Sequence, residues 1–111
     1  MFTNEKATKN QQTKVNKEDD LFLSSQIGGW VYILKSRVDN KLYTGSTNNL
    51  RKRFLEHNSG KVFSTRLRRP FDVVYYEAYR SEIDARKRET NLKLRSRALV
   101  QLKKRIQQSI K

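Results

Sequence analysis

The sequence predicts a small α+β domain in which a three-stranded, mostly antiparallel sheet is covered by helices. Three observations lead to this fold class. Runs of β-branched and aromatic residues occur three times, apolar residues recur at helical spacing in three other segments, and turn-forming residues separate them. The resulting order is strand, strand, helix, strand, helix, helix. A chain of 111 residues supports one domain with a small core.

The first two strands are expected to form an antiparallel hairpin. Residues 30–34 are β-branched and aromatic, and a second short run over residues 41–45 follows the turn-like pair Asp39-Asn40. Gly45, directly after the second run, permits a close backbone approach or a tight turn into the next element.

The first helix is expected over residues 50–57. Ser46, Thr47 and Asn48 offer N-cap oxygens before it, and the Asn-Ser-Gly run over residues 58–60 closes it. The basic segment over residues 61–69 is expected to be structureless up to Pro70.

The remaining elements are a strand and two helices. Residues 72–79 predict a third strand, buried where it meets the hairpin. Ser81 is expected to cap a helix over about residues 82–94. Ser96 is expected to cap a last helix in which apolar residues recur at helical spacing, namely Leu99, Leu102, Ile106 and Ile110.

The domain is expected to occupy residues 27–111, preceded by a disordered tail over residues 1–26. The tail is rich in Lys, Asn, Gln and Thr, and too few apolar side chains are present to offset its ordering entropy. It has no apolar core or small-residue cleavage site that would make it a signal peptide. Its apolar triplet, residues 21–23, is the one part that could dock on the domain.

Positive charge is the strongest compositional signal. The chain has 25 Lys and Arg against 11 Asp and Glu, a net charge of +14. Lysines and acidic residues balance within residues 1–26, so the whole excess lies on residues 27–111. A charge so dense attracts a polyanion, of which nucleic acid is the commonest in a cell. A generic solvated surface and binding to anionic lipid are the alternatives, disfavoured because no basic helix faces a broad apolar stripe.

Composition also excludes several classes of protein. With a mean hydropathy of −0.91, no apolar run approaches the roughly 20 residues that cross a bilayer. The absence of cysteine excludes disulfides, zinc-cysteine sites and thiol nucleophiles. We therefore expect a soluble, cytoplasmic monomer that binds neither a membrane nor a small-molecule cofactor.

Two polar residues of the first helix lie beside its apolar stripe. At 100° per residue, Arg53 and His57 fall together at the edge of the stripe formed by Leu50 and Phe54, where a cleft would form. Taken alone, the pair is more simply a solvated arginine and a partly packed histidine.

The second helix carries a carboxylate inside its apolar stripe, because Ala85, Glu89 and Leu92 follow i, i+4, i+7 spacing. A buried glutamate is costly unless it is paired or holds a cation. An ion pair with Lys93 or Arg86 explains the pattern equally well, as does an outward rotation of the helix.

Two tyrosines, Tyr32 and Tyr43, fall on neighbouring strands of the hairpin with ten residues between them. They can lie close to each other across the strand pair, with their hydroxyls as polar tips on an apolar surface. Ordinary core or surface packing is the alternative.

At these residues the sequence resembles the GIY-YIG nuclease domain family, over about residues 29–95. The resemblance rests on Trp30-Val31-Tyr32, Tyr43-Thr44-Gly45, Arg53, Glu56-His57-Asn58 and Arg86-Lys-Arg-Glu89-Thr-Asn91, of which the last looks like the family's metal-binding helix. The sequence is most similar to the small stand-alone bacterial members, which are related to the incision domain of the bacterial nucleotide-excision nuclease.

The sequence departs from the family pattern at four positions. Trp30, Val31 and Thr44 replace motif residues, while both tyrosines and Gly45 remain. A lysine often follows the glycine in the excision-nuclease relatives, and Ser46 stands there in this chain. One phosphate-neutralising contact would then have to come from elsewhere, for example from Lys52 or Lys61.

The resemblance implies metal-dependent hydrolysis of phosphodiester bonds, with Mg²⁺ or Mn²⁺ as the cofactor. The scissile phosphate gains negative charge in the transition state, so it needs cations around it. Arg53 would bind two phosphate oxygens as a planar fork. Glu89, as the metal ligand, would hold the ion together with several waters.

The resemblance also implies the remaining catalytic roles. Tyr43 would act as the general base, and a phenol, whose pKa is ordinarily about 10, needs nearby positive charge for that role at neutral pH. Tyr32 would orient Tyr43 or a water, and His57 would assist proton transfer or grip the phosphate. The expected catalytic residues are Tyr32, Tyr43, Arg53, His57 and Glu89.

Nucleic-acid contacts are expected mainly with backbone phosphates, which position a substrate without reading its sequence. The expected contact residues are Gly45, Ser46, Lys52, Lys61, Arg66, Arg68, Arg69 and Asn91. The sequence contains no recognition helix or zinc finger, so we expect a structure-selective or weakly sequence-specific endonuclease that acts on DNA rather than RNA. The main alternative is a non-catalytic binding module on the same fold, and a weaker one is an RNA-packaging or ribosome-associated protein.

Overall fold

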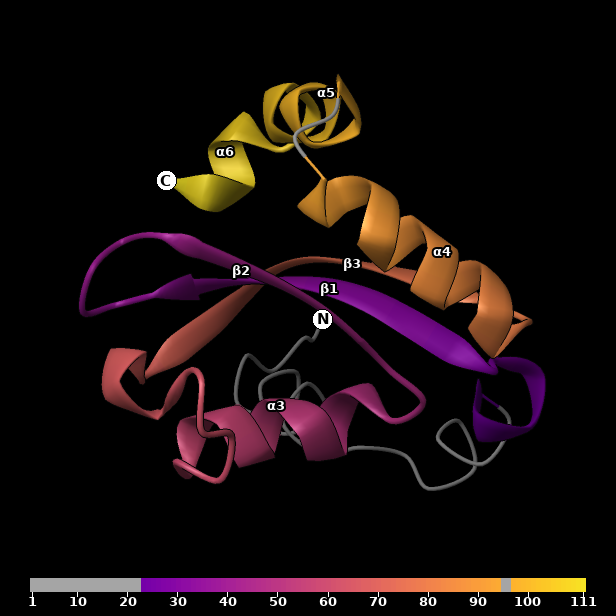
Figure 1. The fold of residues 1–111 in the computed structure, drawn as a ribbon, viewed down its shortest axis with the longest axis horizontal. Coiled ribbons are helices and arrows are strands. Elements are labelled where there is room, and N and C mark those ends of the chain that lie inside the picture. Colours follow the sequence, from indigo (N-terminus) through magenta and orange to yellow (C-terminus); the bar gives the residue numbers. More distant parts are fainter. Residues whose placement is uncertain (1–22, 95–96) are drawn as a thin grey trace, which may run out of the picture.

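The computed structural model of the chain describes residues 23–94 and 97–111. Within them a three-stranded antiparallel sheet separates two layers of helices (Figure 1). The strands are β1 (Gly29–Ser36), β2 (Leu42–Thr47) and β3 (Phe71–Tyr79), and the helices are α3 (Leu50–Asn58), α4 (Glu82–Lys93), α5 (Arg97–Arg105) and α6 (Gln107–Ile110), with a short 3₁₀ turn at Arg66–Arg68. The α+β fold class and the strand and helix order predicted from the sequence are confirmed.

Strand β1 lies at the centre of the sheet, in the order β2-β1-β3, and its two faces hold two separate cores. Val31 and Ile33 point to one face and pack with α4 and α5, whereas Tyr32 and Leu34 point to the other face and pack with α3. Successive strand side chains alternate between faces, so a strand covered on both sides requires a continuous apolar run. The run over residues 30–34 meets that requirement.

Helix α3 covers one face of the sheet through Leu50 and Phe54, the two apolar residues predicted to anchor it. Its N-cap is Asn49, whose side chain accepts a hydrogen bond from the backbone N–H of Lys52 at 3.1 Å. The expectation of a cap among residues 46–48 was wrong, because β2 continues through Thr47 and the helix starts one residue after Asn49.

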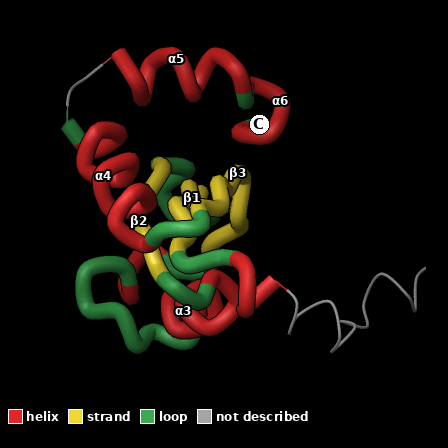
Figure 2. The backbone as a smooth tube through the Cα atoms, turned by 90° about the vertical axis from the view of Figure 1, so that its right-hand side faces the viewer, coloured by secondary structure: helices red, strands yellow, loops and turns green. Residues whose placement is uncertain are grey.

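Helices α4, α5 and α6 form the layer on the opposite face (Figure 2). Helix α4 begins after Ser81, which caps it as predicted by accepting a hydrogen bond from the N–H of Ile83. The helix packs closely on β1 because Gly29 has no side chain: a Cβ there would lie 2.7 Å from the Cβ of Ala85. Glycine at this position therefore determines how near α4 comes to the central strand.

The C-terminal helix completes this core and is interrupted once. Leu102 is buried, and Leu99 and Ile106 pack against the same cluster, as their spacing predicted. The single helix expected here is divided into α5 and α6, because the backbone leaves helical geometry at Ile106, where φ is −115°. The expected cap, Ser96, lies outside the described residues.

Only residues 23–26 of the expected disordered tail fall within the described residues, and they are helical, with the N–H of Ile27 bonded to the carbonyl of Leu23 at 2.9 Å. The rest of that prediction lies outside the described residues. Among the described helices, none has the length and apolar content that crossing a bilayer demands.

The segment between α3 and β3 is ordered, so the expectation that residues 61–69 lack structure was wrong. Val62 and Thr65 are buried, and the hydroxyl of Ser36 on β1 donates to the carbonyl of Arg68 at 2.5 Å. Composition alone suggested a loop because the segment is basic. Its fixed path depends on partners that lie elsewhere in the chain.

A hydrogen-bonded carboxylate connects α4 to β3. Glu77 accepts from the hydroxyls of Tyr75 and Tyr79 and from the guanidinium of Arg88, which lies 2.9 Å away. Burial raises the pKa of Glu77, but the hydrogen bonds from Arg88 and the two tyrosines outweigh it and hold the pKa below its ordinary value. The charged carboxylate is therefore satisfied at neutral pH.

The contribution of the C-terminal helix to the core can be measured with one substitution. Leu102 is 1% exposed, so Leu102→Ala should lower the free energy of unfolding by about 3 kcal/mol through lost burial and a residual cavity. Val100 lies on the same helix and is 56% exposed, so Val100→Ala should change that free energy by less than about 0.5 kcal/mol. Urea unfolding of both variants tests this, and equal losses would contradict the placement of α5.

Candidate active site

The predicted catalytic residues converge from both helical layers on the edge of the sheet formed by β2. Tyr32 comes from β1, Tyr43 from β2, Arg53 and His57 from α3, and Glu89 from α4. The rings of Tyr32 and Tyr43 are 6.5 Å apart between centroids, and the Tyr43 and His57 rings are 5.1 Å apart. The two tyrosines therefore lie close together, as the sequence predicted.

A buried chain of hydrogen bonds lies beneath this edge. The Nε2 atom of His57 is 2.8 Å from the Tyr32 hydroxyl, and its Nδ1 atom is 2.8 Å from Oγ1 of Thr65. Oγ1 of Thr65 in turn donates to the carbonyl of Val62 at 3.5 Å. These partners assign the ring proton to Nδ1, which donates to Thr65, and leave Nε2 to accept from Tyr32. Sequence patterns did not reveal Thr65.

Burial controls the protonation of the two titratable groups in this series of hydrogen bonds, Tyr32 and His57. Tyr32, His57 and Thr65 are at most 1% exposed, so His57 lies inside the core rather than at the edge of the apolar stripe where it was expected. Burial lowers the pKa of His57 to about 4, with a smaller contribution from the Arg53 charge, and burial raises the pKa of Tyr32 to about 12. Both groups are therefore neutral at pH 7.

Gly45 makes room for the Tyr32 ring. It is the direct partner of Tyr32 in the pairing of β1 with β2, and a Cβ at this position would overlap the Tyr32 hydroxyl. The close backbone approach expected at Gly45 is therefore present, and the group that approaches the Gly45 backbone is the Tyr32 side chain. A larger residue would displace the ring from His57.

Arg53 lies between solvent and the buried hydrogen bonds of Tyr32, His57 and Thr65. Its guanidinium forms an ion pair with Glu56 at 3.1 Å, and its interaction with the Tyr32 hydroxyl opposes part of the rise that burial causes in the pKa of Tyr32. The residue lines an open pocket of about 310 Å³ together with Ser46, Lys52 and Glu56. Of the expected phosphate contacts, the structure therefore brings Ser46 and Lys52 next to Arg53.

Glu89 bridges the sheet and α4 at the same edge. The Ser46 hydroxyl donates to one carboxylate oxygen, and Nζ of Lys93 lies 2.7 Å from the other. Ala85 and Leu92, one turn away on either side, are fully buried, so the carboxylate does interrupt an apolar stripe. The ion pair with Lys93, one of the alternatives that the spacing left open, is also present.

Lys93 is a site residue that the sequence analysis did not assign. Besides its bond to Glu89, its Nζ lies 5.8 Å from the centroid of the Tyr43 ring. It therefore places a positive charge beside both the carboxylate and the tyrosine. The i, i+4 spacing from Glu89 was the one signal that pointed to it.

The oxygen donors at Glu89 suit a hard divalent cation. Within residues 23–94 and 97–111, no three His, Asp or Glu side chains lie close enough to chelate a metal. Glu89 and the adjacent Ser46 hydroxyl nevertheless match Mg²⁺, which uses one or two carboxylates, keeps several waters and takes further oxygens from phosphate. The residues present thus fit a weakly held ion.

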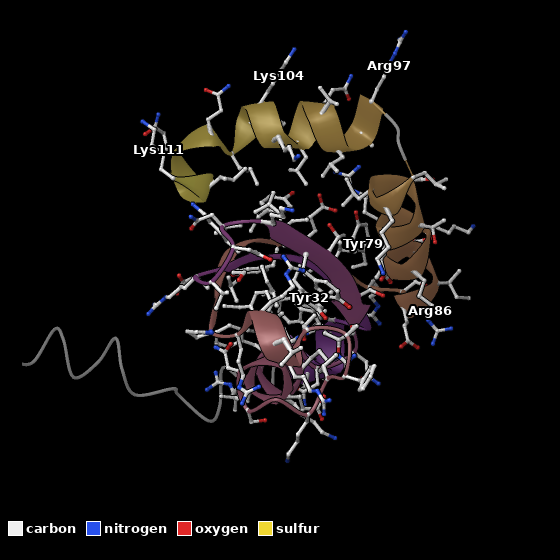
Figure 3. All side chains as sticks on the ribbon, turned by 60° about the vertical axis from the view of Figure 1, so that its left-hand side comes forward. Tyr32, Tyr79, Arg86, Arg97, Lys104 and Lys111 are labelled. Carbon is white, nitrogen blue, oxygen red and sulfur yellow. The ribbon has the colours of Figure 1, made fainter. Side chains whose placement is uncertain are left out.

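The other expected contact residues are distributed around this pocket. Lys61 lies with Lys52 on the outer side of α3, in a shallow depression that borders the Arg53 pocket. Asn91 lines a separate depression on the outer side of α4 with Arg86, which points away from the sheet (Figure 3). The structure therefore places Asn91, an expected nucleic-acid contact, in a different depression from Arg53.

The arginines of residues 61–69 differ in what they contact. Arg68 forms an ion pair with Asp39 at 2.8 Å and lies over the Phe71 ring, so its charge is used within the fold. Arg69 donates to the carbonyl of Arg66. Arg66 lies over the exposed ring of Phe63 and keeps its guanidinium at the surface.

Residues 28–106 match the family model described as the GIY-YIG catalytic domain. A UPF0213 protein of Staphylococcus haemolyticus is 45% identical over 69 residues, which cover 61% of this chain and 83% of that protein. A UPF0213 protein of Syntrophus aciditrophicus is 46% identical over 71 residues, covering 62% of this chain and 80% of that protein. No solved structure matches the chain.

Burial of His57 should make stability depend on pH. The pKa of His57 is about 4 when folded and 6.5 ordinarily, so the unfolded chain binds the proton first and acid favours unfolding. The free energy of unfolding should fall by about 2 kcal/mol between pH 7 and pH 5. His57 is the single histidine of the chain, so no other side chain normally titrates in this window.

Urea unfolding at the two pH values measures the effect. His57→Gln, which removes the titrating ring, provides the control and should show a much smaller difference between pH 7 and pH 5. A wild-type stability that stays constant over this range would contradict a buried, neutral histidine.

Proposed function

Since the chain belongs to the GIY-YIG family, we propose that it is a metal-dependent endonuclease that hydrolyses phosphodiester bonds in nucleic acid. One observation carries the proposal: Arg53 lines an open pocket together with Ser46, whose hydroxyl donates to Glu89, in a chain of net charge +14. Lys93, the ion-pair partner of Glu89, lies 5.8 Å from the Tyr43 ring. We propose DNA as the substrate and structural rather than sequence selectivity, since phosphate contacts position a duplex without reading its bases.

Arg53 would neutralise the scissile phosphate. Its side chain is 38% exposed, so it can reach a substrate, while Glu56 and the Tyr32 hydroxyl hold it from the protein side. A guanidinium binds two phosphate oxygens at once and stabilises the charge that develops as the phosphoryl group becomes five-coordinate. Preorganisation by Glu56 reduces the entropy lost on binding.

Tyr43 is the better placed of the two tyrosines to take a proton from the attacking water. The hydroxyl of Tyr32 already donates to His57, and its pKa is raised to about 12. Tyr43 lies instead on the edge strand β2, and Nζ of Lys93 is 5.8 Å from the centroid of its ring. Tyr32 and His57 would then position Tyr43 and Arg53, with His57 held neutral.

Glu89 would hold Mg²⁺ or Mn²⁺, with the Ser46 hydroxyl beside it. The bound ion would supply positive charge to the leaving oxygen. Lys93 must give up its bond to Glu89 for this to happen, and the freed ammonium remains beside Tyr43 and the substrate phosphate. Lys93 would thereby provide the cation that relatives carry directly after the motif glycine.

A non-catalytic DNA-binding module is the second candidate. The paired state of Glu89 favours it, since both carboxylate oxygens already have partners in Ser46 and Lys93. Such a module would bind nucleic acid with steep salt dependence and leave it intact.

Nicking of supercoiled plasmid at low salt separates the two candidates. Wild type should nick with Mg²⁺ or Mn²⁺ and not with chelator. Glu89→Gln and Arg53→Ala should each slow nicking by about 100-fold or more, because each removes a charge aimed at the transition state. In chelator, Glu89→Gln should bind the plasmid at least as well as wild type. Asp84→Asn, on the exposed side of α4, is the matched control and should nick normally.

Retarded but intact plasmid in every wild-type lane would support the binding module instead. Parallel loss of binding and nicking in Arg53→Ala would assign that residue to substrate binding alone.

Lys93 gives a second, independent test of the site. Lys93→Gln should lower the Mg²⁺ concentration needed for half-maximal nicking, because Glu89 loses a competing cation, and should lower the maximal rate by about tenfold. Lys87→Gln, on the outer side of the same helix, is the control. An unchanged metal dependence in Lys93→Gln would show that the ion does not bind at Glu89.

A further inference from the structure

Two large apolar side chains project from the segment between α3 and β3. Phe63 is 80% exposed and Leu67 is 83% exposed, the highest values among the large apolar residues of the described chain. Burying a side chain of this kind ordinarily stabilises a folded protein through the hydrophobic effect. Neither residue obtains that stabilisation within the domain.

The exposure does not result from a loose loop, because residues on both sides of the pair and one residue between them are anchored. Val62 is 8% exposed and Thr65 is fully buried against His57. Arg68 is held by Asp39, and its carbonyl accepts from Ser36. The anchored backbone thus directs Phe63, Arg66 and Leu67 outward together, and we name these three residues the stacking element.

The chemistry of the stacking element matches nucleic acid. The guanidinium carbon of Arg66 lies 4.8 Å from the centroid of the Phe63 ring, so a cation and an aromatic face are presented as one unit. The segment over residues 60–70 contains four basic residues, Lys61, Arg66, Arg68 and Arg69, and no acidic one. Aromatic rings that stack on bases beside arginines that contact phosphates are the common means of binding unpaired nucleotides.

The position of the stacking element relative to the proposed active site is also fixed. Thr65 lies two residues from both Phe63 and Leu67 along the chain. It is joined to Tyr32 through His57 by two hydrogen bonds of 2.8 Å each. A base held at Phe63 would therefore lie at a fixed position relative to the proposed active site.

We propose that Phe63 and Leu67 insert at a break in base stacking, and that the protein selects DNA containing unpaired bases at a junction. Apolar side chains inserted between bases partly unstack a base step in other DNA-binding proteins. The cost of unstacking is lowest where the bases are already unpaired, so such side chains favour a junction. The inference rests on the proposed function, since it assumes that nucleic acid occupies the basic pocket.

Binding in chelator tests this inference separately from catalysis. The probes are a fully paired DNA duplex and the same duplex with an unpaired flap that carries 2-aminopurine at the junction. Wild type should prefer the flap by about tenfold or more. Phe63→Ala should lower affinity for the flap by about five- to a hundredfold, since stacking on one aromatic residue contributes that much, and should change affinity for the duplex by less than about twofold.

Three further variants sharpen the test. Leu67→Ala should reduce the flap preference, whereas Phe63→Trp should retain it. Insertion beside 2-aminopurine should change its fluorescence when the wild type binds, and Phe63→Trp should cause the same change. Val100→Ala, an apolar residue of α5 that is 56% exposed, should bind both probes as wild type does. All four substitutions are at exposed positions, so unchanged far-UV circular dichroism is expected of each.

Several results would overturn the inference. Equal affinity of wild type for the two probes would do so, as would equal losses on both probes in Phe63→Ala. Phe63→Ala could instead abolish binding to anionic vesicles, or self-association, and leave the flap preference unchanged. The first result would assign the stacking element to a membrane, and the second to another copy of the chain. A flap preference without any metal-dependent nicking would sustain the inference and contradict the proposed nuclease activity.

Discussion

The hydrogen-bonded chain from Tyr32 through His57 to Thr65 is the interaction on which the rest of the site depends. It joins the central strand, the end of α3 and the segment before β3, which are otherwise separated by loops. All three side chains are buried, and an unpaired polar group there would cost about 1–3 kcal/mol. These hydrogen bonds therefore favour one arrangement of the site, in which the Tyr32 ring lies beside Gly45 and Arg53 lies one helical turn before His57. A small domain obtains a rigid site in this way from very few residues.

A second constraint acts at the edge of the sheet, where the two helical layers meet across β2. Ser46 belongs to the strand that leads into α3, and Glu89 belongs to α4 on the other side of the sheet. Their hydrogen bond, together with the Glu89 to Lys93 ion pair, balances a partly buried carboxylate. A metal ion would therefore have to compete with Lys93 for the Glu89 carboxylate. Substrate phosphate would assist the ion by supplying further oxygen ligands.

Local patterns predicted the parts of this structure that local physics determines. The apolar run of β1, the Leu50 and Phe54 anchors and the Ser81 cap depend on residues near in sequence, and so does the carboxylate between Ala85 and Leu92. The features that were missed depend on partners far apart in the chain. Thr65 became a site residue only through His57, and the segment around it is ordered through Ser36 and Asp39. The Asn49 cap was missed because pairing with β1 extends β2 beyond its apolar run.

The distribution of acidic residues explains how the fold tolerates so much positive charge and where that charge remains available. Asp39, Asp72 and Glu77 each pair with an arginine in positions that hold strands or loops together. Arg97, Lys104 and Lys111 project from the outer side of α5 and α6 (Figure 3). Cations gathered on one surface repel one another in a folded domain, and a polyanion that binds there removes that repulsion. Binding to the folded state alone raises stability by mass action, so nucleic acid bound at these cations would also stabilise the fold.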